Sequence, residues 1–356
     1  KSMNSFYIQN SRWLTAIGTL SFASAFGQTF FIALFAGEIR DEFHISHSMW
    51  GGIYAIGTLS SAILMFRFGG LVDRYNVKTL STILLISLSA FCFMMMNVST
   101  IWFLPIIIFG LRFCGQGFLS HISMVLAGKW FLKNRGKTIA ISGLGFSIGE
   151  ALYPFLFVSI MAIIGWRSSW GLAGVIILVI MLFIRPLLSV DRKASSSELN
   201  PLKPLNGMQQ RNWTRSEVLR CWVFWAMIPA VIAQSMFGTT YFFQQVHLAE
   251  SKNWELRTFV ALIPFYTITS LISLFSVGFL IDKYRTTPIL PFCLLPGVIG
   301  FVLAAGSQSI IGAALAFSLL GILQGMNTAI AGAFWPEYFG TKHLGSIRAV
   351  ATSAIV

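Results

Sequence analysis

Two charged side chains lie in the middle of long apolar segments. Arg112 lies within the apolar segment 101–127, and Glu150 lies within the segment 138–164. A charge at the centre of a bilayer costs roughly 2.5 to 3.5 kcal/mol on insertion scales, so such residues are usually functional. A guanidinium binds a carboxylate through paired hydrogen bonds, and a desolvated glutamate can take up a proton. The two residues therefore predict a site that binds an anion and exchanges a proton.

Two interpretations of this pair are open. Arg112 and Glu150 reach the same depth in helices joined by a short loop, so they could form a permanent ion pair that fixes helix packing. Alternatively, Arg112 binds a substrate carboxylate while Glu150, displaced from it, accepts the proton. His121, nearer the end of the first segment, is expected to hydrogen-bond to a backbone carbonyl.

Uncharged polar side chains recur near the middle of other apolar segments. Amide side chains in a bilayer tie helices together, or they line a polar cavity. As a set they favour a polar binding site, and we expect its members to be Gln28, Gln234, Tyr266, Gln324 and Asn327.

The elements that position these residues are membrane-spanning helices. Of the 356 residues, 56% are hydrophobic and 10% are charged, against about a quarter charged in soluble domains. Apolar stretches of about 20 residues, the length that crosses a bilayer, follow one another with short polar breaks. We therefore expect an all-α membrane protein.

The helices fall into two groups. Six are expected in residues 1–184, a polar cytoplasmic linker in 185–220, and a second bundle in 221–356. Ten and a half helices are visible, so we expect twelve in all, with roughly 40 residues of the second bundle beyond Val356.

The net charge of +13 describes topology rather than a nucleic-acid partner. Cations concentrate in alternate loops, as the positive-inside rule requires, which places both termini of a complete chain in the cytoplasm. The inner-face cations are Arg74, Lys78, Lys129, Lys133, Arg135, Lys137, Lys283, Arg285 and Lys342, and those outside are Arg40, Arg167, Lys252 and Arg257. We expect a cytoplasmic or plasma membrane location.

Enzyme chemistry is not expected. The four cysteines show no ligand or disulfide spacing, and His44 and His47 lack a third metal ligand. We therefore expect no catalytic residue, metal or cofactor. The lipid bilayer, a small molecule and protons are the expected partners of a chain that works as a monomer.

An internal repeat has a constant offset of 209 residues. Gly69, Leu71, Asp73 and Tyr75 recur as Gly278, Leu280, Asp282 and Tyr284, and the same offset joins Gly136 to Gly345 and Ala140 to Ala349. Parallel repeats of this kind place a substrate site between two halves near the midplane. Asp73 is expected to accept from a helix N-terminus and to pair with Arg74 or another cation.

The loop after the second helix resembles the signature loop of the major facilitator superfamily. Its sequence is Gly69-Gly70-Leu71-Val72-Asp73-Arg74-Tyr75-Asn76-Val77-Lys78, with Asn76 and Val77 where the signature has Gly and Arg. The resemblance implies a major facilitator fold of two six-helix bundles. It also implies a cytoplasmic gate at Gly69, Asp73, Arg74, Gly278 and Asp282.

Two further stretches are similar to the monocarboxylate and oxalate/formate branch of that superfamily. They run from Lys129-Trp130-Phe131 into Gly143, and from Trp335-Pro336-Glu337 into Gly345. The resemblance implies secondary transport of a small organic anion by alternating access, either with protons or by exchange, and we expect proton coupling. Members of the branch often carry a cation in the eighth helix, where this chain has Thr267, Thr269 and Ser270.

Other classes stay open at this point. The runner-up is a proton antiporter that exports drug-like or siderophore-like solutes, since Gly145, Gly149 and Pro154 echo an antiporter pattern. A channel or sensor on the same fold would show uncoupled flux or none.

Overall fold

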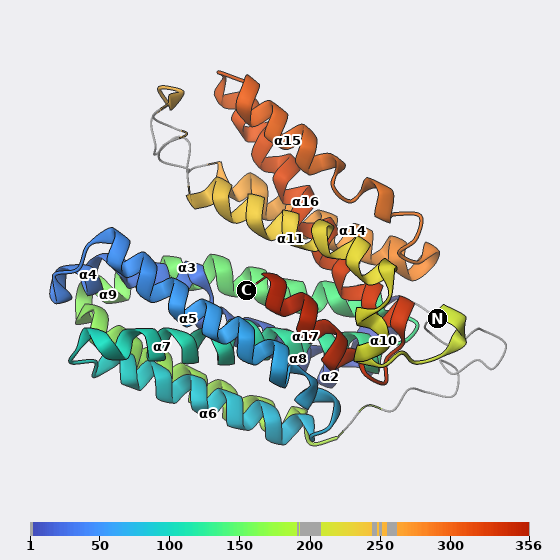
Figure 1. Cartoon of the computed structure of the whole chain (residues 1–356), viewed down its shortest axis with the longest axis horizontal. Helices are drawn as coiled ribbons and strands as arrows, with labels where there is room; N and C mark the ends of the chain where they lie inside the picture. Colours follow the sequence, from blue (N-terminus) through green and yellow to red (C-terminus); the bar gives the residue numbers. More distant parts are fainter. Residues whose placement is uncertain are drawn as a thin grey trace.

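The computed structural model is built of helices in the part of the chain that it describes. The described residues are 3–190, 192, 208–243, 248, 251–254 and 262–355. Figure 1 shows two groups of helices that meet at one end of the molecule. We call helices α2 to α9 the N-terminal half and helices α11 to α17 the C-terminal half. Part of the expected linker lies outside the described residues.

The first crossing of the N-terminal half is broken at Gln28. A short helix α1 (Met3–Gln9) precedes α2 (Ser11–Ser24) and the 3₁₀ turn η1 (Ala25–Gly27). Gln28 is extended, and the chain continues through α3 (Thr29–Ile32), η2 (Ala33–Phe35) and α4 (Ala36–Phe43), with a bend of 43° at the break. The break therefore leaves Gln28 outside regular helix and places Thr29 at the start of α3.

The next three crossings follow the order expected from hydropathy. Helix α5 (His47–Phe68) ends in the 3₁₀ segment η3 (Gly69–Asp73), and α6 (Val77–Met96) returns. The fourth crossing begins with η4 (Ile101–Phe103) and α7 (Leu104–Leu111), passes through the π-helical segment η5 (Arg112–Leu119), and ends as α8 (Ser120–Trp130). Arg112 therefore opens a widened helical segment of a kind often found at functional sites.

The fifth and sixth crossings both belong to α9 (Arg135–Leu187), which is interrupted by a turn at Gly165. Its φ of 79° lies in the left-handed region that glycine adopts without strain, and no neighbour lies within 4 Å of a Cβ placed there. Gly165 is therefore where the chain reverses between the two crossings.

The C-terminal half follows a short linker helix. The 3₁₀ segment η6 (Met208–Gln210) and α10 (Arg215–Leu219) lead into α11 (Trp222–Phe243). Helix α14 (Ile263–Tyr284), the turn η7 (Leu290–Phe292) and α15 (Leu295–Gly306) follow. Helix α16 (Ile310–Phe339) and α17 (Leu344–Ile355) complete the half, and α17 packs against α5, η3 and α8 of the N-terminal half.

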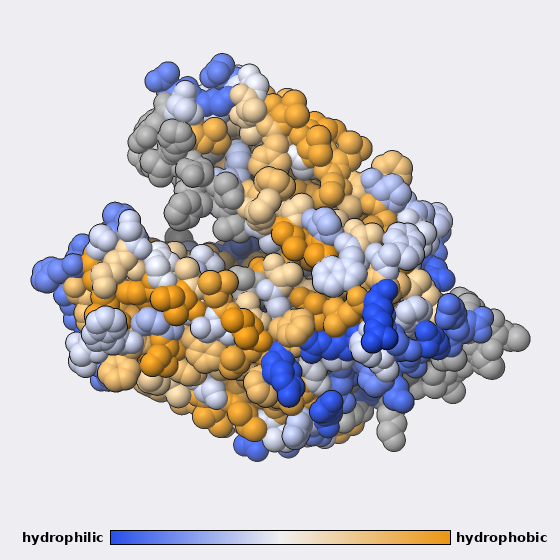
Figure 2. All heavy atoms as spheres, viewed as in Figure 1, coloured by the Kyte–Doolittle hydropathy of each residue, from blue (hydrophilic) through white to orange (hydrophobic). Residues whose placement is uncertain are grey.

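Within the described ranges, six helices are long and apolar enough to span a bilayer, and a seventh qualifies if the bent pair at Gln28 is one span. Three shorter apolar helices, Trp222–Gly238, Leu290–Gly306 and Leu344–Ile355, accompany them. Large apolar side chains also cover much of the visible outer surface (Figure 2), as expected where lipid is the solvent. The chain is a multi-pass integral membrane protein, as the sequence predicted.

The two halves enclose a hollow at one end only. Figure 2 shows the hollow on the side away from α10, while α17, η3 and α8 close the opposite side. The closed side carries the linker, and it is therefore the face that charge distribution assigns to the cytoplasm.

Candidate functional site: two helix caps and a buried polar centre

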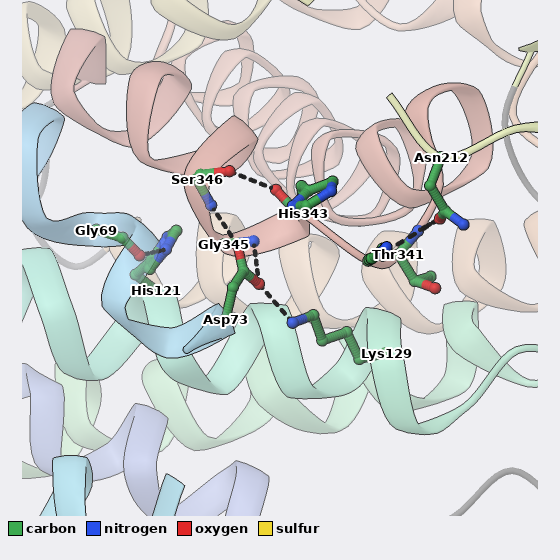
Figure 3. A network of polar contacts seen from close by, with 10 residues as sticks. Gly69, Asp73, His121, Lys129, Asn212, Thr341, His343, Gly345 and Ser346 are labelled. Carbon is green, nitrogen blue, oxygen red and sulfur yellow. Dashed lines mark hydrogen bonds and ion pairs between the residues drawn. The ribbon is translucent and has the colours of Figure 1, made fainter. Parts of the chain in front are cut away.

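Asp73 caps a helix of the opposite half. Its carboxylate accepts hydrogen bonds from the backbone N–H groups of Gly345 (2.9 Å) and Ser346 (2.8 Å) at the start of α17. Lys129 of α8 pairs with the same carboxylate (Figure 3). The exposed N–H groups and dipole of a helix N-terminus stabilise a negative charge in this position. We call this contact the first cap.

Asp282 makes the equivalent contact in the opposite direction. Its carboxylate accepts from the backbone N–H groups of Gly136 (2.7 Å) and Lys137 (3.1 Å) at the start of α9. Every member of this second cap lies 209 residues from its counterpart in the first, since Asp73 matches Asp282 and Gly345 matches Gly136. Each half thus supplies one carboxylate and one helix N-terminus to the other half.

Glycine is required where the helices meet beside the caps. A Cβ on Gly345 would lie within 3 Å of Val72 and Asp73, and a Cβ on Gly136 would overlap the carbonyl of Gly278. Gly69 likewise lies against Ala349. Small residues at these points bring the carboxylates within hydrogen-bonding distance of the opposite backbone.

The cation that joins the first cap is Lys129. The sequence suggested Arg74 or another cation, and Lys129 takes the role while Arg74 is exposed to solvent. Arg74 follows Asp73 at the end of η3, whereas Lys129 approaches from the last turn of α8. Successive residues of a helical turn project in different directions, so Arg74 does not point toward the carboxylate of Asp73.

His121 fixes the backbone from which Asp73 projects. Its Nε2 lies 3.1 Å from the carbonyl oxygen of Gly69, and its Nδ1 lies 3.5 Å from the hydroxyl of Thr352 in α17. Because the carbonyl can only accept, Nε2 carries the hydrogen, and Nδ1 accepts from the threonine. The expected bond to a carbonyl is present (Figure 3).

The linker binds the turn that precedes α17, a role that sequence reasoning missed. Asn212 accepts from the backbone N–H groups of Thr341 and Lys342, both at 3.1 Å, just before α17 (Figure 3). The N–H of Trp213 donates to the carbonyl of Phe339. The only sequence feature that pointed to this role was the residue type, because asparagine side chains often hydrogen-bond to nearby backbone.

A capping box holds this part of the linker in shape. Thr214 and Glu217 cap α10 reciprocally, which places Arg215 with its guanidinium 4.0 Å from the centre of the Phe66 ring at the end of α5. The linker therefore touches the second crossing as well as the loop before the eleventh.

Arg112 is buried at the centre of the N-terminal half, with 2% of its surface exposed. Its Nη1 donates to the hydroxyl of Thr29 (2.8 Å), and Tyr54 donates to the same oxygen (3.0 Å). The guanidinium carbon lies 5.4 Å from the centre of the Tyr54 ring. Close contact of Gly27 with Gly115 brings the first and fourth crossings together at this level.

Glu150 faces a different partner from the one that sequence suggested. Among the described residues no ion pair joins Glu150 to Arg112. Glu150 instead lies close enough to Tyr266 of α14 for an electrostatic interaction. The carboxyl group therefore sits at the boundary between halves, while Arg112 lies within the N-terminal half.

The remaining predicted polar residues form a group in the C-terminal half. Gln234 of α11 donates to the side chain of Gln324 in α16, and Asn327 donates to the carbonyl of Ala230 at 3.3 Å. These bonds join the two helices at the expected depth. Gln28 is nine-tenths buried at the break of the first crossing, directly before Thr29.

Two further buried charges were not predicted as site residues. Glu337 of α16 pairs with Arg285 (3.0 Å) and accepts from the N–H of Thr286, which fixes the loop after α14. Arg348 lies in α17, the eleventh crossing, with 8% of its surface exposed.

These observations define an integral membrane protein of two helical halves, joined by symmetry-related caps at the face that carries the linker and hollow on the other side. The chain belongs to the Major Facilitator Superfamily, whose sequence profile matches residues 17–355.

Comparison with individual proteins gives the same family. The chain is 25% identical over 233 residues to the uncharacterized MFS-type transporter YhjX of Escherichia coli K12, and the matched region covers 65% of this chain. That region spans 56% of the length of YhjX.

Solved structures share the fold. The human organic anion transporter MFSD10 (TETRAN) superposes with a TM-score of 0.69 at 15% identity, covering 97% of this chain and 92% of that one. The proton:xylose symporter XylE gives 0.67 at 12%, covering 99% and 86%. At these identities the likeness concerns the fold alone. The expected superfamily is thus confirmed, and the monocarboxylate branch within it stays a prediction.

Proposed function

We propose that this protein carries a small organic anion across the membrane by alternating access, with proton coupling. The observation that carries the proposal is the position of Arg112, a cation buried at mid-depth and oriented by two neutral hydroxyl groups. A desolvated guanidinium favours a carboxylate because the attraction is strong where water is excluded. Thr29, which holds it, is itself exposed.

Glu150 is the proposed proton carrier. It lies at the boundary between the halves beside Tyr266, so rocking of one half against the other changes its surroundings. A carboxyl group that moves between a dry and a hydrated setting exchanges its proton accordingly. In this mechanism substrate binding at Arg112 and proton exchange at Glu150 occur in separate places and are coupled through the movement of the halves.

The two caps are the proposed cytoplasmic gate. While Asp73 and Asp282 hold α17 and α9, the central site communicates with the outside only. Release of both caps would let the halves tilt apart on the cytoplasmic side. Gln234, Gln324 and Asn327 supply the opposite wall of the proposed substrate site.

Uptake into proteoliposomes tests the proposal. A panel of labelled monocarboxylates and dicarboxylates is offered with and without an inward proton gradient. We expect gradient-driven uptake of at least one anion. Arg112→Gln should raise its KM by about 10-fold to 100-fold, the loss of a charge-assisted pair. Glu150→Gln should transport without response to the gradient.

Matched variants separate site effects from general damage. Lys342→Gln and Glu38→Gln remove exposed charges of the same type and should transport normally. No uptake of any anion by a monodisperse wild-type preparation would refute the anion proposal, and a panel of larger exported solutes would then be tested instead. Unaltered kinetics in Arg112→Gln would refute the site assignment alone.

A further inference from the structure

Arg348 is a buried cation for which the described residues supply no acidic partner. Its Nη1 donates to the carbonyl of Ala331 in α16 at 3.2 Å, and its Nε has no hydrogen-bond partner. With 92% of its surface covered, the guanidinium has lost most of its water. A desolvated charge that is only partly bonded destabilises the folded protein. Charged residues within a membrane are usually functional, so we expect a role of Arg348 in the transport cycle.

The charges around Arg348 leave it uncompensated within the described part of the chain. Asp73 is engaged by Lys129 and by the start of α17. His121, which interacts electrostatically with Arg348, is bonded to the Gly69 carbonyl and to Thr352 and carries no negative charge. No carboxylate here is within ion-pairing distance of Arg348. The residual charge at this point is positive.

The location of Arg348 is directly beneath the first cap. It lies three residues beyond Gly345 in α17, about 4.5 Å further along the helix. Its neighbours belong to α8 through His121 and to α16 through Ala331. In α16 the polar residues Gln324 and Asn327 precede Ala331 at spacings of seven and four, on one helix face. This polar face leads from the middle of the membrane toward Arg348.

We propose that Arg348 forms a second anion site, at the cytoplasmic end of the pathway, which opens when the two caps release. Separation of α17 from η3 and α8 exposes the guanidinium to the cytoplasmic vestibule, where it binds a carboxylate or another small anion. The site is separate from Arg112 in depth and in half. The identification of a carried carboxylate as its ligand depends on the proposed function, whereas the anion site itself does not.

Selective chemical labelling tests the site without knowledge of the substrate. Thr352→Cys places a thiol one turn from Arg348, and Asp73→Asn in the same full-length chain releases the first cap. The thiol is modified from the cytoplasmic side, in inside-out vesicles, with impermeant thiosulfonates that carry either a sulfonate or a trimethylammonium group. The chain with native cysteines only measures background.

The expected result is preferential reaction with the anionic reagent. One positive charge about 6 Å away attracts the anion and repels the cation, so removing it in Arg348→Gln should lower the anionic-to-cationic rate ratio about tenfold at low salt. Arg348→Lys should retain most of the preference. Lys342→Gln removes an exposed cation from the same face and should leave the ratio nearly unchanged.

Two results would overturn the proposal. One is a rate ratio no higher than that of free cysteine, which is also what neutralisation by an acid beyond Val356 would produce. The other is an equal fall in Arg348→Gln and Lys342→Gln. The first comparison needs only the reporter protein, so it remains decisive if Arg348→Gln does not fold. Failure of anion uptake with a positive labelling result would refute the proposed substrate class and not this site.

Discussion

The carboxylate of Asp73 lies 2.9 Å from the backbone nitrogen of Gly345, 272 residues away in the opposite half of the protein. The repeat places Asp282 on Gly136 in the same way. The receiving group in each case is backbone at a helix N-terminus, so the strength of the contact depends on one carboxylate and on the closeness of two helices. Both dependences can be tested.

Neutralising either carboxylate should open the cytoplasmic side. Asp73→Asn and Asp282→Asn keep the shape of the side chain and remove its charge, which weakens the interaction with the helix N-terminus by about 1 kcal/mol. We expect roughly fivefold faster alkylation of a Thr352→Cys reporter from the cytoplasm. Asp73→Asn should have the larger effect because it also loses Lys129. Asp41→Asn, exposed in α4, is the matched control, and unchanged rates in both cap variants would exclude a gating role.

Adding a methyl group at the caps should have a similar result for a steric reason. Gly345→Ala and Gly136→Ala place a Cβ against Val72 or the Gly278 carbonyl, at a cost of about 1 to 3 kcal/mol to the closed arrangement. Thermal unfolding in detergent should shift down, and reporter labelling should speed up. Gly51→Ala, which meets nothing within 4 Å, should change neither quantity. Equal stability of all three variants would contradict the close contact.

The hydroxyl groups around Arg112 should tune substrate affinity. Thr29→Val removes the acceptor of both Arg112 and Tyr54, while Tyr54→Phe removes one donor and keeps the ring. A lost hydrogen bond is worth about 1 kcal/mol, so we expect the KM for the transported anion to rise about fivefold in Thr29→Val and less in Tyr54→Phe. Competition binding of unlabelled anion measures this directly. A larger loss in Tyr54→Phe than in Thr29→Val would reverse the proposed roles.

Asn212 of the linker should stabilise the closed cytoplasmic face. Asn212→Ala leaves the N–H groups of Thr341 and Lys342 without their acceptor, and a lost hydrogen bond costs about 1 kcal/mol. Labelling of the Thr352→Cys reporter should quicken by a few fold, while transport from outside should keep its KM. Asn97→Ala, at the C-terminal end of α6, removes an asparagine side chain that donates to the backbone carbonyl of Phe93, and it provides the comparison. If Asn212→Ala and Asn97→Ala behave alike, the linker has no role in gating.

Acidification should act through Glu150 and not through the linker. The pKa of Glu217 lies below its ordinary value, first because the backbone N–H of Thr214 donates to it and then because the Thr214 hydroxyl and Arg211 do. Because the pKa is lowered in the folded state, ionised Glu217 stabilises the fold above the unfolded-state pKa. This stabilisation is lost as the pH falls through the folded-state pKa. From neutral pH to mild acid the α10 cap therefore stays ionised. Glu217→Gln should leave the pH profile of transport in place, and Glu150→Gln should flatten it.

The sequence predicted the members of the caps and not their arrangement. A constant offset shows that Asp73 and Asp282 are equivalent, but equivalence in a repeat does not say which helix each one meets. The crosswise arrangement follows from three-dimensional packing of small residues such as Gly69 against Ala349. In the same way, hydropathy located Arg112 and Glu150 at one depth but carried no information on the direction in which each side chain projects.

Other features were missed for definable reasons. Asn212 lies in a stretch whose serine, proline and basic residues are typical of a solvated segment, and a single capping side chain is invisible to composition. Arg348 was overlooked because cations near a helix end are commonly interfacial. Its burial results from contacts with α8 and α16 that no local pattern encodes.

The use of backbone as the receiving partner also has a consequence for how such a carrier can change over time. Nearly any residue offers an N–H group, so most substitutions in the first turns of α9 and α17 preserve the receiving group as long as positions 136 and 345 remain small. The residues that line the pathway can therefore change with the substrate. The closed state is kept as long as the two aspartates and two glycines of the caps are kept. Duplication of an ancestral half would have delivered all four at once.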